Sequence, residues 1–337
     1  MTGKSTATVP FGSTFADAMA ISWYRDETWS TPECTELAPL ALHPAAHVLH
    51  YASTCFEGLK AYRWEDGSVY VFRLERHIER MRQSAELVCL PQPDASQLRE
   101  MICRLVDRCR NAIPVHPGAL YLRPTLIGDY ANIGSAASPS RTACLYVIAS
   151  PVGEYFKDNQ QGLRIVIDDE NPRSTREFGM AKTGGNYASA LRYIVRARTE
   201  HKADQVLFCP HGDVQETGAA NFLLLNNHEV LTKALDSSFL HGVTRDSVLA
   251  LAAGFGYEVN ERDFLVSDTL AWVNGGGEAA LSGTAAGLAG IGTLIYRDKE
   301  YPVTGGVGGV NTERLQAALR AIQSGHAPDQ HGWLTKV

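Results

Sequence analysis

Hydrophobic and polar residues follow two different periods along this chain, and each period predicts a kind of secondary structure. In the first half, alternation with a period of two predicts strands over residues 68–72, 119–122 and 143–149. Hydrophobic positions spaced near 3.6 residues predict helices over residues 75–88 and 95–111. The first half is therefore expected to be a mixed α/β fold.

The second half shows the same two periods in an irregular order. Helices are predicted to begin near Tyr187, Thr244 and Thr312. Short apolar runs predict strands over residues 163–167, 205–208, 220–225, 258–262 and 278–282. This order does not match the regular strand–helix repeat of a βαβ barrel.

A polar stretch over residues 153–162 separates the two halves and lacks apolar periodicity. The 337 residues are more than one ordinary core needs. We therefore predict two domains, residues 1–152 and 163–337, joined by a linker over residues 153–162. The last stretch, residues 324–337, is rich in Gly, His, Pro and Gln and is predicted to be a weakly ordered tail.

Composition and charge narrow the possible partners. The chain is 45% hydrophobic and 20% charged with a net charge of -6, which lacks the basic excess of nucleic-acid binders. It contains no run of 18 apolar residues, and residues 1–15 show neither a signal-peptide nor a transit-peptide pattern. We therefore expect a cytoplasmic protein that binds neither nucleic acid nor membranes.

The cysteines and histidines do not predict a metal site. The seven cysteines are scattered and form no Cys-x-x-Cys pair, which argues against both a disulfide framework and a zinc site. His43, His47 and His50 share a helical spacing, but Pro44 interrupts the pattern and no acidic ligand lies nearby. Structural histidines are the better interpretation, and no metal is expected.

One lysine stands out for its surroundings. Lys182 lies directly before a glycine-rich turn that opens the helix near Tyr187. Most lysines are solvated surface charges. Here, however, Gly184 and Gly185 remove two side chains beside the amine, so a planar ring can approach it, and the phenol of Tyr187 is within reach. An amine in this position can form a Schiff base with the aldehyde of pyridoxal phosphate.

Such a cofactor also needs a site for its phosphate. The turn after His241 leads into a helix with Thr244 at its mouth, and a helix N-terminus offers unpaired N–H groups and a positive dipole end. A second small-residue turn, Ser282-Gly-Thr-Ala-Ala-Gly, adds the Thr284 hydroxyl. Arg80 lies on the flank of the apolar face of the helix over 75–88, where a surface position is the commoner outcome.

The ring nitrogen and the substrate need partners as well. Glu216 follows a turn and precedes a strongly apolar strand, where it can meet a protonated ring nitrogen; an exposed turn glutamate is the commoner case. Arg123 should share one face of its strand with Tyr121, which makes it a plausible partner for a substrate carboxylate. A glycine-rich segment from Gly306 superficially resembles a dinucleotide-binding loop, but no predicted strand leads into it.

Several ordered segments together resemble the branched-chain amino acid aminotransferases, a family of fold-type IV pyridoxal phosphate enzymes. The resemblance extends from about residue 11 to about residue 319. Its strongest pieces include Phe56-Glu-Gly-Leu-Lys-Ala-Tyr, Tyr121-Leu-Arg-Pro, Lys182-Thr-Gly-Gly-Asn-Tyr, Glu216-Thr-Gly and Ser282-Gly-Thr-Ala. It implies a D-amino acid aminotransferase-like fold with a small N-terminal α/β domain and a larger pseudo-barrel domain, assembled as a homodimer or larger homo-oligomer.

The resemblance also implies roles for individual residues. Lys182 would hold the cofactor covalently and then shuttle a proton. Glu216 would meet the ring nitrogen, and Tyr187 the phenolic oxygen of the ring. The remaining implied contacts are Arg80, Val243, Thr244 and Thr284 for the phosphate, Tyr51, Thr284, Ala285 and Arg123 for the substrate carboxylate, and Phe11, Phe56, Tyr121 and Tyr155 around the substrate side chain, some of them across a dimer interface.

The implied reaction moves the amino group of a branched-chain or similar apolar L-amino acid to 2-oxoglutarate, which yields a 2-oxo acid and L-glutamate. Ala219 and Ala220 depart from the larger residues that many relatives have, so the substrate range can be broader or shifted. Three alternatives stay open. They are a sibling enzyme of the D-amino acid aminotransferase or aminodeoxychorismate-lyase type, a non-catalytic binding protein of the same fold and, more distantly, a dinucleotide oxidoreductase that uses the Gly306 loop.

Overall fold

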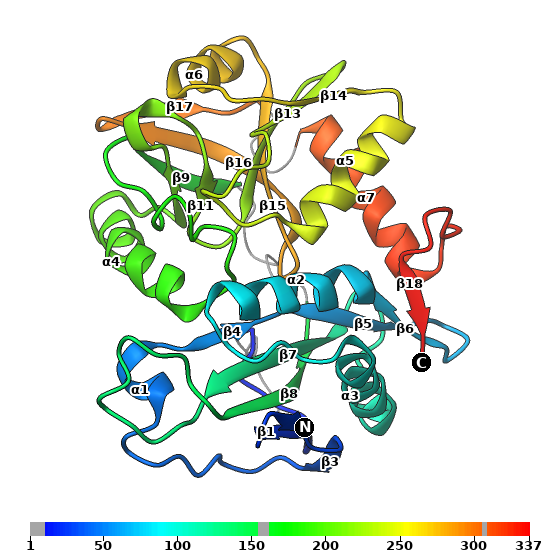
Figure 1. Cartoon of the computed structure of the whole chain (residues 1–337). Helices are drawn as coiled ribbons and strands as arrows, with labels where there is room; N and C mark the ends of the chain where they lie inside the picture. The colour runs from blue at the N-terminus through cyan, green and yellow to red at the C-terminus, as the bar shows by residue number, and fades with distance from the viewer. Residues whose placement is uncertain (1–10, 154–161, 305–308) are drawn as a thin grey trace, which may run out of the picture.

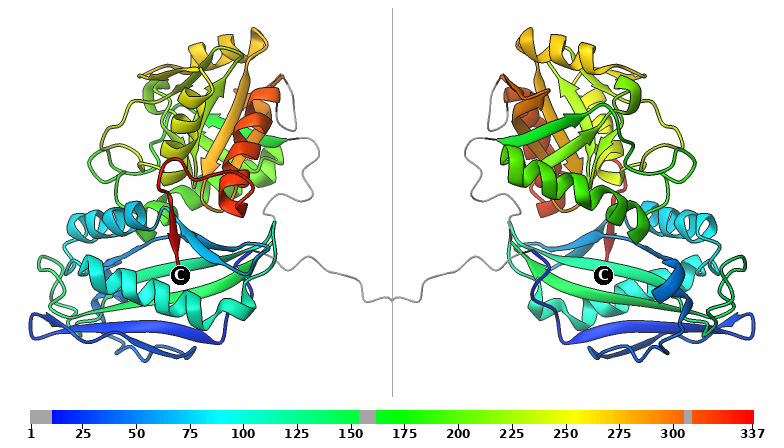
Figure 2. Two further views of the ribbon diagram at one scale, coloured as in Figure 1. Left: turned by 90° about the vertical axis from the view of Figure 1, so that its right-hand side faces the viewer. Right: turned by 90° about the vertical axis from the view of Figure 1, so that its left-hand side faces the viewer.

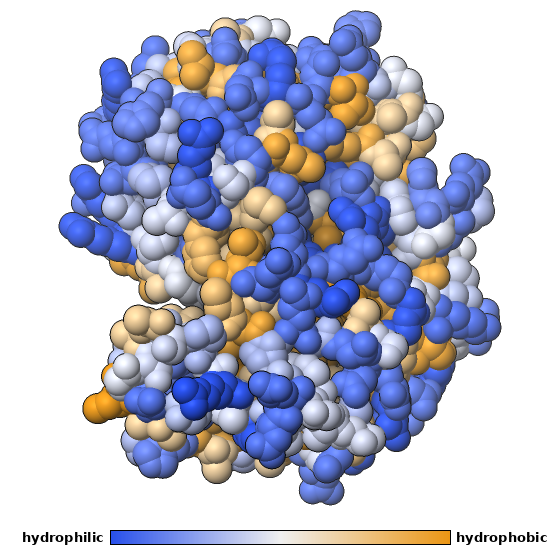
Figure 3. Space-filling model, viewed as in Figure 1, coloured by the Kyte–Doolittle hydropathy of each residue, from blue (hydrophilic) through white to orange (hydrophobic). Residues whose placement is uncertain are grey.

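A computed structural model of the chain describes residues 11–153, 162–304 and 309–337. The described residues form two large β-sheets, one built mainly from the first half of the chain and one from the second half, with helices packed against them (Figure 1). Two views from opposite sides, each turned by 90° from that of Figure 1, show the halves stacked one above the other (Figure 2). Hydrophobic residues gather along the junction between them on the face seen in Figure 3.

The first sheet has the strand order β18-β6-β5-β7-β8-β1-β2, with β3 paired to β1 and β4 to β7. Three helices accompany it, α1 (His47–Tyr51), α2 (Leu74–Leu87) and α3 (Ala95–Arg108), followed by the 3₁₀ turn η1 (Arg110–Ala112). The strands are β1 (Ala18–Arg25), β2 (Thr28–Trp29), β3 (Glu33–Glu36), β4 (Thr54–Phe56), β5 (Leu59–Arg63), β6 (Val69–Phe72), β7 (Ala119–Gly128), β8 (Ala143–Val152) and β18 (Leu334–Lys336).

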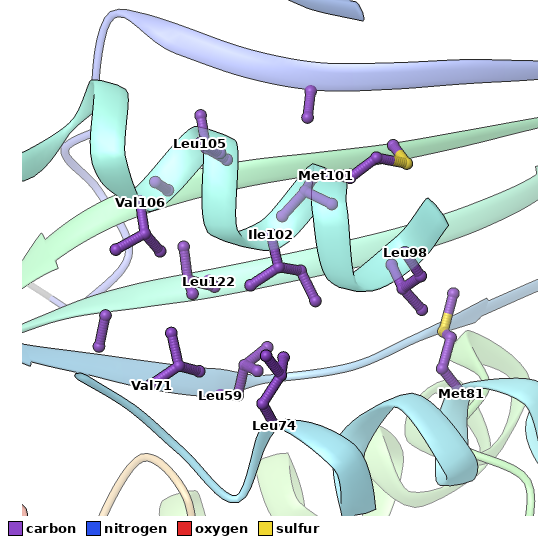
Figure 4. Close-up of a cluster of buried hydrophobic side chains, with 14 of the residues drawn as sticks. Leu59, Val71, Leu74, Met81, Leu98, Met101, Ile102, Leu105, Val106 and Leu122 are labelled. Carbon is purple, nitrogen blue, oxygen red and sulfur yellow. The ribbon is translucent and has the colours of Figure 1, made fainter. Parts of the chain in front are cut away.

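The core of this half lies between α3 and the sheet. The carboxylate of Asp94 accepts a hydrogen bond from the Gln97 N–H at 3.0 Å and so caps the start of α3. The apolar face of α3 then packs onto β5, β6 and β7 (Figure 4). The buried side chains on that face are Leu98, Met101, Ile102, Leu105 and Val106. The predicted helical period therefore corresponds to a real buried face.

The second sheet closes on itself. Its order is β11-β10-β9-β16-β15-β12-β13-β14, β17 is paired to β16, and an additional pairing of β11 with β12 completes a ring. The predicted pseudo-barrel is thereby confirmed. The strands are β9 (Leu163–Asp168), β10 (Gln205–Phe208), β11 (Glu216–Thr217), β12 (Asn221–Leu225), β13 (Glu229–Thr232), β14 (Glu258–Glu261), β15 (Glu278–Gly283), β16 (Gly287–Tyr296) and β17 (Lys299–Pro302).

Four helices and a short turn accompany the ring: α4 (Gly184–His201), η2 (Pro210–Gly212), α5 (Val243–Gly254), α6 (Val266–Asn274) and α7 (Val310–Ser324). The helices predicted near Tyr187, Thr244 and Thr312 are α4, α5 and α7, each starting one to three residues earlier than predicted. β16 was not predicted, because its glycines dilute the apolar signal of a strand.

The prediction of a weakly ordered C-terminal tail is wrong. Leu334–Lys336 forms β18, which pairs antiparallel with β6 of the first sheet. Trp333 is buried, and its ring lies 5.7 Å from that of Phe72. The Arg73 guanidinium stacks over the same indole at 5.1 Å. The tail is ordered because a partner strand more than 250 residues away supplies its hydrogen bonds, which local composition does not reveal.

The N-terminus of α7 is occupied by the protein itself. The buried Glu278 carboxylate accepts hydrogen bonds from the backbone N–H groups of Asn311 and Thr312, at 3.0 and 2.8 Å. A Cβ on Gly309 would lie 2.0 Å from the Glu278 Cδ, so glycine is needed there. A nucleotide phosphate at this helix end would have to displace the buried Glu278 carboxylate from these N–H groups, which disfavours the dinucleotide alternative. Residues 305–308 of that glycine-rich segment lie outside the described part of the chain.

Among the described residues, no helix is long and apolar enough to cross a membrane. The cytoplasmic location stays a prediction. The predicted linker over 153–162 falls mostly on residues 154–161, which the structure does not describe, so the domain boundary also stays a prediction.

Candidate active site

A cavity of about 450 Å³ lies between the two sheets and is lined from both. The α4 turn, the start of α5 and the β15–β16 hairpin form one side, while β4, β7 and α2 form the other. The predicted site residues that line this cavity are Phe11, Phe56, Arg80, Tyr121, Arg123, Lys182, Tyr187, Glu216, Val243, Thr244, Thr284 and Ala285. The fold thus brings most of the predicted residues together, although their roles are not decided by this proximity.

Lys182 is held in the cavity by its own backbone. Its N–H donates to the Ser84 Oγ of α2 at 3.0 Å, and its carbonyl accepts the Phe56 N–H of β4 at 2.9 Å. Its Nζ donates to the Tyr187 hydroxyl at 2.6 Å. Because α4 starts only at Gly184, the lysine lies outside the helix and its side chain enters the cavity. The amine and the phenol are therefore neighbours, as the sequence predicted.

Tyr187 is more acidic than an ordinary tyrosine. Burial raises the pKa of its phenol, but the positive charges of Lys182 and Arg173 outweigh burial and hold this pKa below its usual value. The Arg173 guanidinium lies 5.3 Å from the centre of the Tyr187 ring. The phenol can therefore carry, or share, negative charge beside the lysine amine.

Glu216 is only 2% exposed, so the commoner outcome of an exposed turn glutamate does not apply. Its Oε1 accepts hydrogen bonds from Arg173 Nη1 at 2.5 Å and from the Leu240 N–H at 3.0 Å. Burial raises the pKa of this carboxyl above its ordinary value, although Arg173 opposes the effect. A buried carboxyl at the cavity wall needs a further positive partner to ionise fully.

Arg173 was missed by the sequence reasoning. It is 1% exposed, and its Nε also donates to the Gly218 carbonyl at 3.2 Å. It lies in the irregular polar segment between β9 and α4, where no hydrophobic period distinguishes a buried position from a surface one. No signal in the sequence could have identified it.

The start of α5 offers unpaired donors to the cavity. Gly242 is the N-cap residue of α5, so no side chain caps the helix, and the first N–H groups lie at Val243 and Thr244. Glycine is needed there, because a Cβ on Gly242 would lie 1.9 Å from the Asn221 Oδ1. Thr284 reaches the same cavity from the β15–β16 hairpin. This combination of helix end and hydroxyl is typical of a phosphate site.

Arg80 points inward from α2, contrary to the commoner surface position. Its Nε and Nη2 donate to the two oxygens of Glu57 at 2.6 and 2.9 Å, and its Nη1 donates to the His241 carbonyl at 3.0 Å. Three of the five guanidinium N–H groups are thus used, which leaves two for a phosphate. Glu57, a residue to which the sequence assigned no role, therefore orients the Arg80 guanidinium.

The Glu57 carboxyl is ionised in this setting. Burial raises its pKa, but the Arg80 guanidinium outweighs burial and holds the pKa well below its ordinary value. The residue is 1% exposed and lies between β4 and β5, next to Phe56. Glu57 holds Arg80, and Arg80 in turn donates to the His241 carbonyl just before α5. The acid therefore helps to connect the first half of the chain to the start of α5.

Arg123 and Tyr121 share one face of β7, as predicted. Arg123 Nη2 donates to the Tyr121 hydroxyl at 2.9 Å, and the guanidinium stacks over the Phe56 ring at 4.7 Å. Gly58 makes room for this pair, since a Cβ there would lie 1.9 Å from the Tyr121 hydroxyl. The Arg123 Nε is buried and has no hydrogen-bond partner among the described residues. An unpaired buried donor costs free energy, so a bound carboxylate is its natural partner.

One predicted residue, Tyr51, is not brought to the cavity, and a second, Tyr155, has no described position. Tyr51 lies on α1, where its hydroxyl donates to the Ile133 carbonyl, and it is not among the residues that line the cavity of its own chain. Tyr155 lies outside the described residues. Ala219 and Ala220 both line the cavity, so the absence of larger side chains there widens it.

The histidine prediction agrees with the structure of the described residues. His47 is buried and its Nδ1 lies 2.8 Å from the Ser53 hydroxyl, while the exposed His50 lies 2.9 Å from the Pro44 carbonyl. No group of three or more His, Cys, Asp or Glu side chains in the described ranges is arranged to hold a metal ion.

Comparison with known proteins identifies the family and agrees with the fold. The family model described as amino-transferase class IV matches residues 54–293, more than half of the chain. The chain is 37% identical over 335 residues to branched-chain-amino-acid aminotransferase 2 of Bacillus subtilis (strain 168), covering 97% of this chain and 92% of that protein.

Solved structures agree with that match. The branched-chain amino acid aminotransferase of Escherichia coli has a TM-score of 0.75 at 27% identity and covers 94% of this chain and 98% of its own. The branched-chain amino acid aminotransferase of Thermobaculum terrenum, in its PLP form, has the same fold, with a TM-score of 0.78 at 21% identity and coverage of 96% and 99%.

Proposed function

The chain belongs to the class IV aminotransferases, and on that premise we propose that it transfers amino groups from branched-chain or similar apolar L-amino acids to 2-oxoglutarate, with pyridoxal phosphate as its cofactor. The observation that carries the proposal is the Lys182 amine, 2.6 Å from the Tyr187 hydroxyl in a cavity that also holds the buried Glu216 and an uncapped helix end. The products are the matching 2-oxo acid and L-glutamate.

The donor set of the cavity fits this cofactor. Lys182 would take its aldehyde, Tyr187 its phenolic oxygen and Glu216 its ring nitrogen, whose positive charge would also satisfy the buried carboxyl. The phosphate would be held by two N–H groups of Arg80, the first N–H groups of α5 and Thr284. When bound, pyridoxal phosphate supplies an aldehyde carbon that exchanges amines and a ring that withdraws electrons from the substrate.

The residues of this chain handle the proton and the charge. With its amine free, Lys182 Nζ would take the proton from Cα of the amino donor and pass it to the aldehyde carbon of the cofactor; in the reverse half it would carry a proton from that carbon to Cα of the acceptor. The hydrogen bond to Tyr187 keeps this amine at a defined place. Glu216 is fixed by hydrogen bonds from Arg173 and from the Leu240 N–H, and its negative charge would keep the ring nitrogen of the cofactor protonated.

Substrate recognition divides into a polar and an apolar part. The α-carboxylate, common to the amino acid and the 2-oxo acid, meets the unpaired Arg123 Nε and the N–H groups of Thr284 and Ala285. The apolar side chain meets Phe56, Ala220 and other walls of the cavity. When the carboxylate is fixed, the Cα–H bond is held in one orientation, from which Lys182 can reach its proton.

The test is a panel of amino donors with 2-oxoglutarate. Leucine, isoleucine and valine should form L-glutamate, whereas D-alanine should not, and aminodeoxychorismate should not be cleaved. Turnover of D-alanine or of aminodeoxychorismate in place of the branched-chain donors would favour the sibling enzymes. Absence of any turnover together with absence of cofactor absorbance would favour a non-catalytic binding protein.

Replacing Ala220 by Met is expected to narrow the side-chain pocket. The added thioether fills space that Ala220 leaves open, so kcat/KM for leucine should fall several-fold more than for valine, since the smaller side chain needs less room. The control is Ala317→Met, at an exposed position of α7. If the ratio of kcat/KM for leucine to kcat/KM for valine is the same in wild type and in Ala220→Met, Ala220 does not contact the substrate side chain.

We also propose that the active molecule is a homodimer. Tyr51 does not line the cavity of its own chain, and the apolar side chains of Leu49 and Ile133 beside it are 58% and 65% exposed. Leu191 of α4 is 57% exposed as well. Light scattering should give a mass of at least two chains of 36.7 kDa. A single-chain mass at micromolar concentration would contradict this proposal.

A further inference from the structure

The hairpin between β15 and β16 separates two cavities. Thr284, Ala285 and Ala286 form its tip and line both the active-site cavity and a second, smaller cavity on the other side. Each peptide group is planar and trans, so its carbonyl and its N–H point in opposite directions. An Ala285 carbonyl held toward the second cavity therefore turns the N–H of the same peptide group, which belongs to Ala286, toward the active site.

Lys60 reaches this tip from the other half of the chain. It lies on β5, opposite Tyr121 of β7, and its Nζ donates to the Ala285 carbonyl at 2.9 Å. The residues that line the second cavity include His77, His116 and Arg320, and none of the described lining residues is acidic. The backbone carbonyl is thus the acceptor that the structure provides for the Lys60 ammonium.

The base of the hairpin has its own support. Gln316 of α7 donates to the Leu288 carbonyl at 2.5 Å, and the strand pairs of β15 with β16 run from Gly283↔Gly287 to Ala280↔Gly290. These contacts maintain the hairpin without Lys60. The lysine therefore acts on the orientation of the tip and not on the existence of the turn.

We propose that Lys60 is a positioning residue, which holds the Ala285 carbonyl on the far side of the tip so that the Ala286 N–H of the same peptide group stays turned toward the active site and serves as a further donor to the substrate α-carboxylate, beside those of Thr284 and Ala285. The inference rests on the proposed function, which assigns that carboxylate to the hairpin. If the Ala285 carbonyl turned toward the active site, its oxygen would lie against the substrate α-carboxylate and the N–H of the same peptide group would no longer be available as a donor. Lys60 prevents this arrangement and adds a positive charge behind the donors.

The charge of Lys60 is sensitive to pH near neutrality. Burial and the nearby Arg320 guanidinium lower its pKa to about 8. The ammonium is present below that pH and is lost as the pH rises through it, and a neutral amine is a weaker donor to the carbonyl. The other titratable or charged groups that face this cavity are Tyr62 of β5, His77 of α2, His116 and Arg320 of α7.

The experiment compares Lys60→Met, Lys60→Gln and Lys60→Arg with wild type, all loaded with cofactor, and uses Lys299→Met on the exposed strand β17 as the control. The first measurement is kcat and KM for leucine and for 2-oxoglutarate. The second is the dissociation constant of 4-methylvaleric acid, a branched-chain carboxylic acid without an amino group, by titration calorimetry. Thermal unfolding of each variant is recorded in parallel.

Lys60→Met should raise both KM values and the dissociation constant roughly tenfold, the loss expected for one charge-assisted hydrogen bond, with a smaller change in kcat. Lys60→Gln should lie between Lys60→Met and wild type, and Lys60→Arg should restore most of the affinity. From pH 7 to pH 9 the dissociation constant should rise in wild type but not in Lys60→Arg, because arginine stays charged. Lys299→Met should match wild type.

Wild-type dissociation constants in both Lys60→Met and Lys60→Gln would overturn the proposal, as would a fall in kcat with unchanged KM values. The proposal would also be overturned if Lys60→Met lost affinity and thermal stability together while Lys60→Gln, as stable as wild type, bound with wild-type affinity. These results differ from a failure of the proposed function, in which wild type itself would neither transaminate leucine nor bind 4-methylvaleric acid.

Discussion

Lys182→Ala is expected to lose transamination by more than about 10⁴-fold while keeping its fold. Proton transfer by a positioned side chain alone contributes about 10²–10⁴-fold, and the variant also loses the covalent attachment of the cofactor. The fold should persist because the side chain makes one described hydrogen bond, to Tyr187, and the backbone contacts to Ser84 and Phe56 are unaffected.

Two measurements separate attachment from proton transfer at residue 182. Borohydride reduction followed by peptide mass analysis should place the cofactor adduct on Lys182 in wild type and find none in Lys182→Ala. A small alkylamine added to the variant should restore part of the single-turnover rate, because it supplies the missing base in the vacated space. The control is Lys299→Ala on β17, which should behave as wild type. Turnover retained in Lys182→Ala would refute both roles.

Glu216→Gln is expected to lower kcat by about 10²–10³-fold, the range seen when one electrostatic contact to the reacting system is removed. The amide keeps the shape of the side chain and can still accept the Leu240 N–H, but it has no negative charge to keep a ring nitrogen protonated. The substitution also leaves Arg173 as a buried cation without its partner, which costs about 3–5 kcal/mol of stability.

The control for this variant is Glu261→Gln. Glu261 is also paired with a buried arginine, Arg245, but it is 42% exposed and lies outside the active-site cavity. Its variant should therefore lose little stability and no activity. Stopped-flow absorbance of single half-reactions, with thermal unfolding alongside, measures both effects. Wild-type rates in Glu216→Gln would show that this carboxylate does not act on the ring nitrogen.

The cofactor residues could be predicted where their signal is local. Lys182 precedes a glycine pair and a helix, and the α5 donors follow a glycine turn, so short-range geometry identifies both. Arg80 was harder, because its helical position lies on the edge of the apolar face and either orientation satisfies the period. Its inward turn follows from Glu57, which pairs with it from another segment.

The residues that orient the site could not be predicted. Arg173 and Lys60 lie in segments whose patterns predict ordinary surface charges, and each becomes buried only when a distant segment packs over it. The C-terminal tail shows the same effect, since its composition predicts disorder and its pairing with β6 provides order. The composition of a segment reflects that segment alone, whereas its burial depends on which distant part of the chain packs against it.

The sequence by itself determined the mixed α/β architecture and the family, and it singled out Lys182 as the proposed reactive lysine, because periodicity and short motifs depend on residues within a few positions of one another. Only the tertiary structure decided which charges support that lysine. Glu57 holds Arg80, Arg173 holds Glu216, and Lys60 holds a carbonyl 225 residues away. The strengths of these contacts depend on burial and on distances between remote segments, which no local pattern contains.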